Sequence, residues 1–240
     1  MANAQRTYVL VHGAFHGGWC WRRVADRLVA GGHRVITPTC TGLGERLHLL
    51  TAEGGLETAV ADIVNVLIFE ELEDVILVGH SFGGVLITAA ADCEPRRIRH
   101  LVYLDAMVLD DGESALSHLP PDVAAERRRS ANRSSHGLTM PPPPPSAFNV
   151  TDTADVDWMS RRLTPHPFAT YTDALHLSAP MGNGLPKTYI ACTNPAYAPL
   201  APSRARVCTQ PGWSWHDLAT GHAPMITAPD ALTSLLLEIR

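Results

Sequence analysis

The sequence predicts an α/β protein whose mostly parallel sheet of about six strands carries flanking helices and a helical lid insertion. Apolar runs typical of strands alternate with segments of helical periodicity over residues 7–104 and again over residues 187–239. Between these stretches, over residues 107–185, the alternation gives way to short helical segments around a run of prolines. The 240 residues therefore suit a single domain, residues 1–240, with a lid at 107–185.

The first half of the chain is expected to alternate strands with helices. Short runs rich in β-branched and aromatic residues indicate the strands, and apolar residues at helical spacing indicate the helices. Gly31 and Gly32 end the first helix, as glycine commonly does. The expected strands are Thr7–Val11, Arg34–Thr37, Val75–Val78 and Arg99–Leu104, and the expected helices are Trp19–Ala30, Leu56–Glu70 and the segment after Ser81 to about Cys93.

The lid region contains two segments of helical character, Asp122–Ser130 and Asp155–Leu163. Between them, Met140–Ser146 holds five consecutive prolines, which can form only an extended polyproline stretch. A stiff connector is favoured here over a ligand for an SH3-type domain. Such a lid would supply the apolar wall of a substrate pocket.

The end of the chain returns to the alternation of strands and helices. Pro229 suits the first turn of a final helix, because its missing N–H is not needed there. The expected elements are a strand at Lys187–Cys192, a short helix at Ala201–Gln210, a strand at Trp213–Leu218, a loop at Gly221–Met225 and a helix at Pro229–Ile239.

Composition restricts the class of partner and the compartment. Hydrophobic residues make up 45% and charged residues 18%, and the net charge of -5 gives no nucleic-acid footprint. The 5 scattered cysteines lack CxxC spacing, which argues against a disulfide framework or zinc site and favours a reducing cytoplasm. No segment resembles a signal peptide or a membrane span. We expect a small-molecule substrate and no membrane or nucleic-acid partner, with a homodimer left open.

The strongest chemical signal is Gly79-His80-Ser81-Phe82-Gly83, which joins a buried-type strand to a helix. In a G-x-S-x-G turn the serine adopts a strained backbone conformation, and the two glycines let the strand and helix pack closely. The hydroxyl then projects from the carboxyl end of the strand. Ser81 is therefore the candidate nucleophile, with the Phe82 N–H as a candidate oxyanion donor.

A serine nucleophile needs a base and a second oxyanion donor. His222 lies in a loop between the last strand and the last helix, at the sheet edge where Ser81 is expected, and it follows the serine in the chain. The first strand ends in His12-Gly13-Ala14-Phe15, whose backbone can place the Ala14 N–H beside that of Phe82. His222 is the candidate base, and Ala14 and Phe82 form the candidate oxyanion hole.

The acid that would orient His222 is less evident. An acid commonly follows the penultimate strand, yet Cys192-Thr193-Asn194 and the residues up to Arg204 offer no carboxylate. Asp105 ends the strand after the nucleophile strand, so it can approach the histidine from a neighbouring position. Asp105 is therefore the favoured acid. The alternative is that Asp105 only caps a turn or a helix. The other aspartates considered lie further into the lid or inside the last strand, at Asp110, Asp111 and Asp217.

Four residues are candidates to line the pocket: His16 in the glycine-rich loop, and Trp158, Phe168 and Tyr171 in the lid. The alternative for the aromatic residues is that they only pin the lid to the core. His12 and His16 stand four apart, but across a strand-to-loop junction, where they do not make a zinc pair. No GxGxxG follows a strand and no P-loop is present, so neither a metal nor a nucleotide cofactor is expected.

Together, HGAFHGGWCW, GHSFGG and GHAPM resemble the α/β-hydrolase superfamily, in its compact branch of plant hydroxynitrile lyases and methylesterases. The runs TPTCTGLGERLHLL and LVYLDAMVLDDGES look like bacterial members such as carbendazim hydrolase. The resemblance implies the α/β-hydrolase fold, Ser81 with His222 as catalytic pair, and the Ala14 and Phe82 backbone as oxyanion hole. It also supports Asp105, because these bacterial members carry an aspartate in the YLDA segment. Relatives often read GHSYGG and GHDxM, so substrate preference differs where this chain has Phe82 and Ala223-Pro224.

These observations predict a carboxylesterase-like serine hydrolase that cleaves a small, largely apolar ester, or a related carbamate or amide, through a Ser81 acyl-enzyme. One alternative is a hydroxynitrile-type lyase in which Ser81 and His222 act only as acid and base. Such lyases use a lysine near the cyanide site, whereas Lys187 starts a strand. A second alternative is a non-hydrolytic protein that binds or tailors a natural product.

Overall fold

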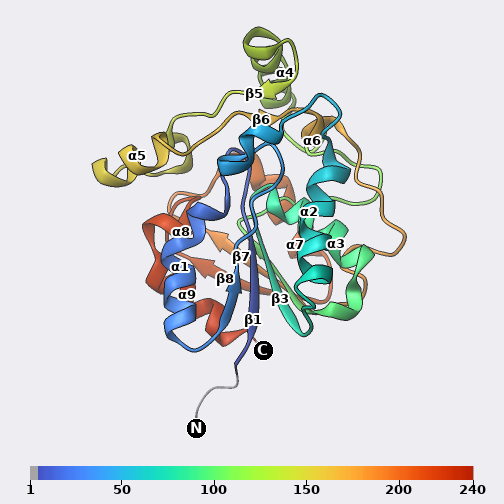
Figure 1. Ribbon diagram of the computed structural model, residues 1–240, viewed down its shortest axis with the longest axis vertical. Coiled ribbons are helices and arrows are strands. Elements are labelled where there is room, and N and C mark those ends of the chain that lie inside the picture. Colours follow the sequence, from blue (N-terminus) through green and yellow to red (C-terminus); the bar gives the residue numbers. More distant parts are fainter. Residues whose placement is uncertain (1–4, 240) are drawn as a thin grey trace.

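The computed structural model describes residues 5–239 and contains a six-stranded sheet in the order β2-β1-β3-β4-β7-β8 (Figure 1). Every neighbouring pair in this sheet is parallel. All residues of the central strand β3 are buried, because helices cover both faces of a parallel sheet. The expected α/β class is thereby confirmed. The strands are β1 (Thr7–Val11), β2 (Arg34–Ile36), β3 (Val75–His80), β4 (Ile98–Leu104), β7 (Lys187–Cys192) and β8 (Trp213–Leu218).

Helices pack on both faces of the sheet through apolar stripes. On one side α1 contacts α9, and on the other α2 contacts α3 (Figure 1). The stripe of α1 buries Val24 and Leu28, and that of α2 buries Ile63 and Leu67, each at helical spacing. The helices are α1 (Arg22–Ala30), α2 (Leu56–Phe69), α3 (Gly83–Cys93), α7 (Ala201–Thr209), α8 (Pro224–Thr227) and α9 (Pro229–Glu238), with 3-10 turns η1 (Gly18–Trp21), η2 (Gly44–Leu49), η3 (Pro95–Arg97) and η5 (Ala198–Leu200).

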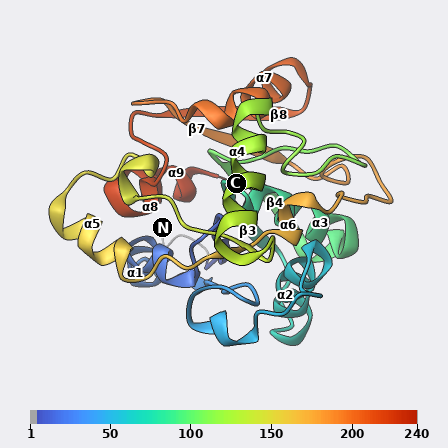
Figure 2. The ribbon, with the colours of Figure 1, turned by 90° about the horizontal axis from the view of Figure 1, so that it is seen from above.

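The cap segment, residues 105–186 between β4 and β7, crosses the carboxyl ends of the strands. In Figure 1 its helix α4 lies at the top and its helix α5 at the left, and Figure 2 shows both from above. A two-residue antiparallel pairing of β5 with β6 ties the segment together. Its elements are α4 (Pro121–Ser135), β5 (Thr139–Met140), η4 (Pro145–Phe148), α5 (Thr153–Ser160), β6 (His166–Pro167) and α6 (Ala169–Thr172).

Two local expectations were wrong. Met140–Ser146 is not extended throughout, because Pro145 begins the 3-10 turn η4. The loop expected at Gly221–Met225 gives way to helix α8 at Pro224. In both cases a proline starts the helical turn, where its fixed φ angle suits the first position and its lack of an N–H costs nothing.

Within residues 5–239, no helix combines the length and the apolarity that crossing a bilayer requires. Cys20, Cys40 and Cys192 are buried free thiols, and Cys93 and Cys208 are exposed free thiols. The cytoplasmic location inferred from the sequence stays a prediction.

Candidate active site

Ser81 lies in the sharp turn between β3 and α3, with a φ angle of 53°. This left-handed conformation is uncommon for a residue other than glycine and marks a strained site. The turn closes only because its flanking residues are small. A Cβ at Gly79 would lie 2.5 Å from the carbonyl oxygen of Gly83, and a Cβ at Gly83 would lie 2.8 Å from that of His12.

The fold brings Ser81, His222 and Asp105 into one hydrogen-bonded chain. His222 Nε2 lies 3.1 Å from Ser81 Oγ, and His222 Nδ1 lies 2.7 Å from Asp105 Oδ2. A carboxylate only accepts hydrogen bonds, so Nδ1–H donates to Asp105 and Nε2 is left to accept from the serine hydroxyl. This arrangement is the one that general-base activation of a serine requires.

Asp105 follows β4 directly and is fully buried. Its Oδ1 accepts a hydrogen bond of 3.1 Å from Arg204 of α7 and a longer one of 3.4 Å from the Cys192 N–H. Asp105 also has a positive φ angle, 39°. Burying a charge is costly unless it is paired, and both carboxylate oxygens here have partners. Arg204 was not recognised from the sequence, since only the fold brings α7 against the end of β4.

The amides of Ala14 and Phe82 were the expected oxyanion donors. Both residues are buried, and within residues 5–239 neither backbone N–H donates to a protein acceptor. Buried N–H groups without a partner are rare and indicate a place for a ligand atom. The next amide in the loop, that of Phe15, is occupied by His166 Nδ1 at 3.2 Å. The two unpaired amides can therefore donate to a negatively charged oxygen near Ser81.

Two side chains that sequence reasoning missed hold the His222 loop. His80, the variable residue of the G-x-S-x-G turn, donates from Nε2 to the His222 carbonyl oxygen at 2.7 Å. Tyr197 stacks on the His222 ring with a centroid distance of 4.0 Å and an interplanar angle of 14°. The place of His80 in the motif was a usable signal, whereas nothing in the sequence indicates where the Tyr197 ring points.

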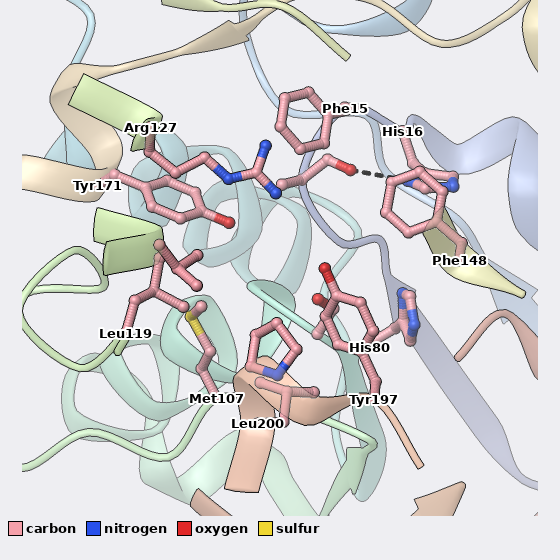
Figure 3. Close-up of a pocket in the computed structure, with 14 residues that line it drawn as sticks. Phe15, His16, His80, Met107, Leu119, Arg127, Phe148, Tyr171, Tyr197 and Leu200 are labelled. Carbon is pink, nitrogen blue, oxygen red and sulfur yellow. Dashed lines mark hydrogen bonds between the residues drawn. The ribbon is translucent and has the colours of Figure 1, made fainter. Parts of the chain in front are cut away.

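A narrow cavity of ≈ 20 Å³ lies beside Ser81 (Figure 3). That volume suits about one water molecule. Of the expected pocket residues, His16 and Tyr171 line it. Most of its wall is apolar, and the lining residues are Ala14, Phe15, His16, His80, Ser81, Met107, Leu119, Val123, Arg127, Phe148, Tyr171, Tyr197, Pro199 and Leu200.

Trp158 and Phe168 do not line this cavity, so the structure does not support their assignment to the pocket. Trp158 packs edge-on against Trp19 at 5.0 Å and has the guanidinium of Arg162 over its ring. Phe168 is buried in the cap segment with Arg128 over its ring. Trp158 thus ties the cap segment to Trp19 of the core, which was the alternative for the lid aromatics, whereas Arg128 over the Phe168 ring is a contact within the cap segment.

His12 and His16 each bond to the loop that carries Ala14. His12 Nδ1 donates to the Gly13 carbonyl oxygen and its Nε2 accepts from the Cys40 N–H. His16 Nδ1 donates to the Ala14 carbonyl oxygen at 2.7 Å, which leaves Nε2 as an acceptor without a partner among the described residues. Burial lowers the pKa of His16 to about 3, so this ring stays neutral at ordinary pH.

Four buried histidines should make the protein acid-labile. Burial lowers the pKa of His12, His16, His80 and His166, whereas these residues in the unfolded chain titrate near pH 6.5. Below that pH the unfolded state binds more protons, so stability falls as the pH falls, by up to about 1.4 kcal/mol per unit for each histidine. We expect a clearly lower urea midpoint at pH 5 than at pH 7.

The matched comparison is between one buried and one exposed histidine. His16→Gln should remove about one proton from the number taken up on unfolding at low pH, so the urea midpoint should depend less on pH. His48→Gln, at an exposed position, should leave the pH dependence unchanged. Equal midpoints at pH 5 and pH 7 in the unmodified protein would contradict the account.

Comparisons with known proteins show the family to which the chain belongs. The model of the alpha/beta hydrolase family matches residues 8–235. A carbendazim-hydrolysing esterase from a Nocardioides species is 40% identical over 97% of this chain and 98% of its own length. The putative chloroplastic methylesterase 15 of Arabidopsis thaliana is 28% identical over 98% of this chain, which spans 56% of that longer protein.

A similar solved structure bears on the fold, and a relative by sequence bears on the lyase alternative. An extracellular α/β-hydrolase from a Paenibacillus species superposes with a TM-score of 0.85 over 97% of this chain and 98% of its own, at 24% identity. The α-hydroxynitrile lyase of Arabidopsis thaliana is 36% identical, but over only 48% of this chain and 43% of its own length. The family model, the bacterial relative and the shared fold all lead to one assignment: this chain belongs to the α/β hydrolase family.

Proposed function

We propose that this α/β hydrolase is a carboxylesterase-like enzyme that cleaves small, largely apolar esters through an acyl-enzyme on Ser81. The hydrogen-bonded chain from Ser81 through His222 to Asp105 carries this proposal. The esterases among its relatives support ester cleavage as the reaction.

The geometry suggests a two-step reaction. His222 Nε2 takes the Ser81 proton while Oγ attacks the ester carbonyl, and the Ala14 and Phe82 amides stabilise the resulting oxyanion. As the carbonyl re-forms, the bond to the leaving oxygen breaks, and His222 returns the proton to the departing alcohol. Water then attacks the acyl-enzyme with His222 again as base, releasing the acid and restoring Ser81. Asp105 keeps the imidazole in the required tautomer and stabilises its protonated form.

In this proposal the enzyme is a single domain, and residues 107–185 of the cap segment act as its lid. The cavity of ≈ 20 Å³ has room for about one water molecule, so we expect the cap segment to open when an ester enters. The lid also excludes water once the substrate is bound, which strengthens the hydrogen bonds to the oxyanion.

A substrate panel tests the proposal. Matched esters, carbamates, amides and lactones are incubated with the enzyme, and the acid and alcohol or amine products are identified by mass spectrometry. Esters should be cleaved fastest, because an alkoxide leaves more readily than an amide nitrogen. Absence of cleavage across the whole panel, with a folded protein, would contradict the proposal.

The lyase alternative is less well supported. The chain's lysine, Lys187, begins β7 and therefore lies at the amino end of the strand, whereas Ser81 follows the carboxyl end of β3. The Lys187 ammonium lies over the Trp213 ring, 5.7 Å from its centroid. No observation of the site favours a non-hydrolytic binding role. Cytoplasmic location and a homodimer stay predictions from the sequence.

A further inference from the structure

Arg127 occupies a position on α4 that the helix otherwise gives to apolar residues. Val123, Arg127 and Ala131 succeed one another four residues apart, so they share the face of α4 that points inward. Val123 and Arg127 line the cavity beside Ser81, and Ala131 is fully buried. A charged side chain on this face is unexpected, because buried positions of an amphipathic helix are normally apolar.

Two other arginines of α4 form ion pairs at the surface. Arg129 and Arg133 both pair with Glu126 on the exposed side of the helix. Arg127 makes no ion pair with any carboxylate in residues 5–239, and its guanidinium lies over the Phe15 ring, 5.4 Å from the centroid. A half-buried cation without an anion is costly, and this cost is relieved when a negatively charged group binds.

Two tyrosine hydroxyls accompany this guanidinium. Figure 3 shows Arg127, Tyr171 and Tyr197 pointing toward the middle of the cavity. Burial raises the pKa of both tyrosines, and the Arg127 charge only partly opposes the rise. Both hydroxyls therefore remain protonated and can donate hydrogen bonds beside a permanent positive charge.

Near His16 the cavity offers a hydrogen-bond acceptor, whereas near Arg127 it offers donors. The unpartnered Nε2 of His16 is an acceptor, and the ring packs against Phe148, away from Arg127 in Figure 3. A carboxylate placed beside that nitrogen would be repelled, whereas one placed beside Arg127 would be bound by donors alone. Besides the two amides beside Ser81, the Arg127 end of the cavity is therefore the place that suits an anion, and the His16 end does not.

We propose that Arg127, with the Tyr171 and Tyr197 hydroxyls, binds a carboxylate on the substrate, so that the preferred substrates are esters carrying a second, ionised carboxyl group. This inference rests on the proposed function, because it places the ester carbon at Ser81 in the same cavity. The apolar side chains of Leu119, Val123 and Leu200 line the same cavity. Once the cap segment has opened, a half-ester of a dicarboxylic acid with an aliphatic or aromatic spacer can place its ester at Ser81, its spacer against these apolar side chains and its free carboxylate at Arg127.

The test compares charged and neutral substrates of equal shape. Methyl half-esters of succinate, glutarate, adipate and terephthalate are each paired with the corresponding methyl ester in which a carboxamide replaces the free carboxylate. For the best spacer, kcat/KM should favour the carboxylate by about 10- to 100-fold, the usual range for hydrogen bonds to a charged group. Arg127→Gln should bring that ratio close to one, chiefly by raising KM for the carboxylate.

Matched variants show whether Arg127 binds the substrate carboxylate or only stabilises the fold. Arg127→Lys keeps the charge and should retain part of the preference, and Arg129→Gln, on the exposed side of the same helix, should retain all of it. If the unmodified enzyme prefers none of the carboxylates, the inference is wrong. If Arg127→Gln slows both members of every pair equally, Arg127 only holds the cap segment in place, and the inference is again wrong.

Binding measurements keep this inference distinct from the proposed function. Calorimetry with Ser81→Ala measures the affinity for each intact pair without turnover. A preference for the half-ester that disappears in Ser81→Ala combined with Arg127→Gln supports the carboxylate site even if the unmodified protein cleaves no ester. Equal affinity for both members of every pair would overturn the carboxylate site whatever the activity.

Discussion

Replacing Ser81 with alanine should lower kcat for ester hydrolysis by roughly 10⁴- to 10⁶-fold. The hydroxyl is the atom that bonds to the acyl carbon, and no other side chain in the hydrogen-bonded chain can take its place. The remaining turnover would come from the oxyanion donors and from substrate binding alone. Steady-state kinetics on the best ester of the panel measures the loss.

Ser160→Ala is the matched control for this change. Ser160 lies exposed at the end of α5, and its hydroxyl donates to the Val156 carbonyl oxygen at 2.7 Å. Its replacement should leave kcat within about twofold, since surface substitutions away from special features have small effects. Full activity in Ser81→Ala would exclude covalent catalysis at this residue.

Asp105→Asn should lower kcat by at least about a hundredfold and up to roughly 10⁴-fold. The Asp105 carboxylate accepts the hydrogen bond from His222 Nδ1 at 2.7 Å, which sets the tautomer that leaves Nε2 free to accept from Ser81. An amide NH₂ in that place donates instead and favours the wrong tautomer. The loss should appear in kcat more than in KM, because orientation of the base matters most in the transition state.

Asp217→Asn is the control for the Asp105 variant. Asp217 is exposed on β8, where its carboxylate accepts from Trp215 Nε1 at 2.9 Å, and its replacement should change kcat little. A second control separates structure from catalysis, because Asp105→Asn also removes the anionic partner of Arg204. Arg204→Met breaks the same ion pair but leaves the carboxylate on His222. Equal losses at Asp105 and Asp217, or no loss at Asp105, would overturn the assignment of the acid.

Much of the fold was predictable because long apolar runs carry their own periodicity. The strands Thr7–Val11, Lys187–Cys192 and Trp213–Leu218 have the bounds expected from the sequence. The short elements were missed, including α6 and the β5–β6 pairing. Elements of two to four residues hold no periodic pattern, and contacts with distant parts of the chain determine them.

The candidate catalytic residues were identifiable because their motifs have fixed places in the topology. Ser81 follows a strand, and His222 precedes the last helix, so both had to reach the same sheet edge. Side-chain direction in the cap segment was not identifiable. Trp158 and Arg127 both lie on cap helices, yet only Arg127 lines the cavity. The spacing of Val123, Arg127 and Ala131 was a usable signal, but it indicates only that they share a face and not what that face covers.

The central claim is that folding makes the Ser81 hydroxyl reactive by placing the His222 imidazole against it. Treatment with a fluorophosphonate, followed by intact-mass analysis and peptide mapping, tests this most directly. The account predicts one phosphonyl adduct per chain, located on Ser81, and labelling that is slowed by orders of magnitude in His222→Ala. An unlabelled protein, an adduct on another serine, or equal labelling rates with and without His222 would contradict it.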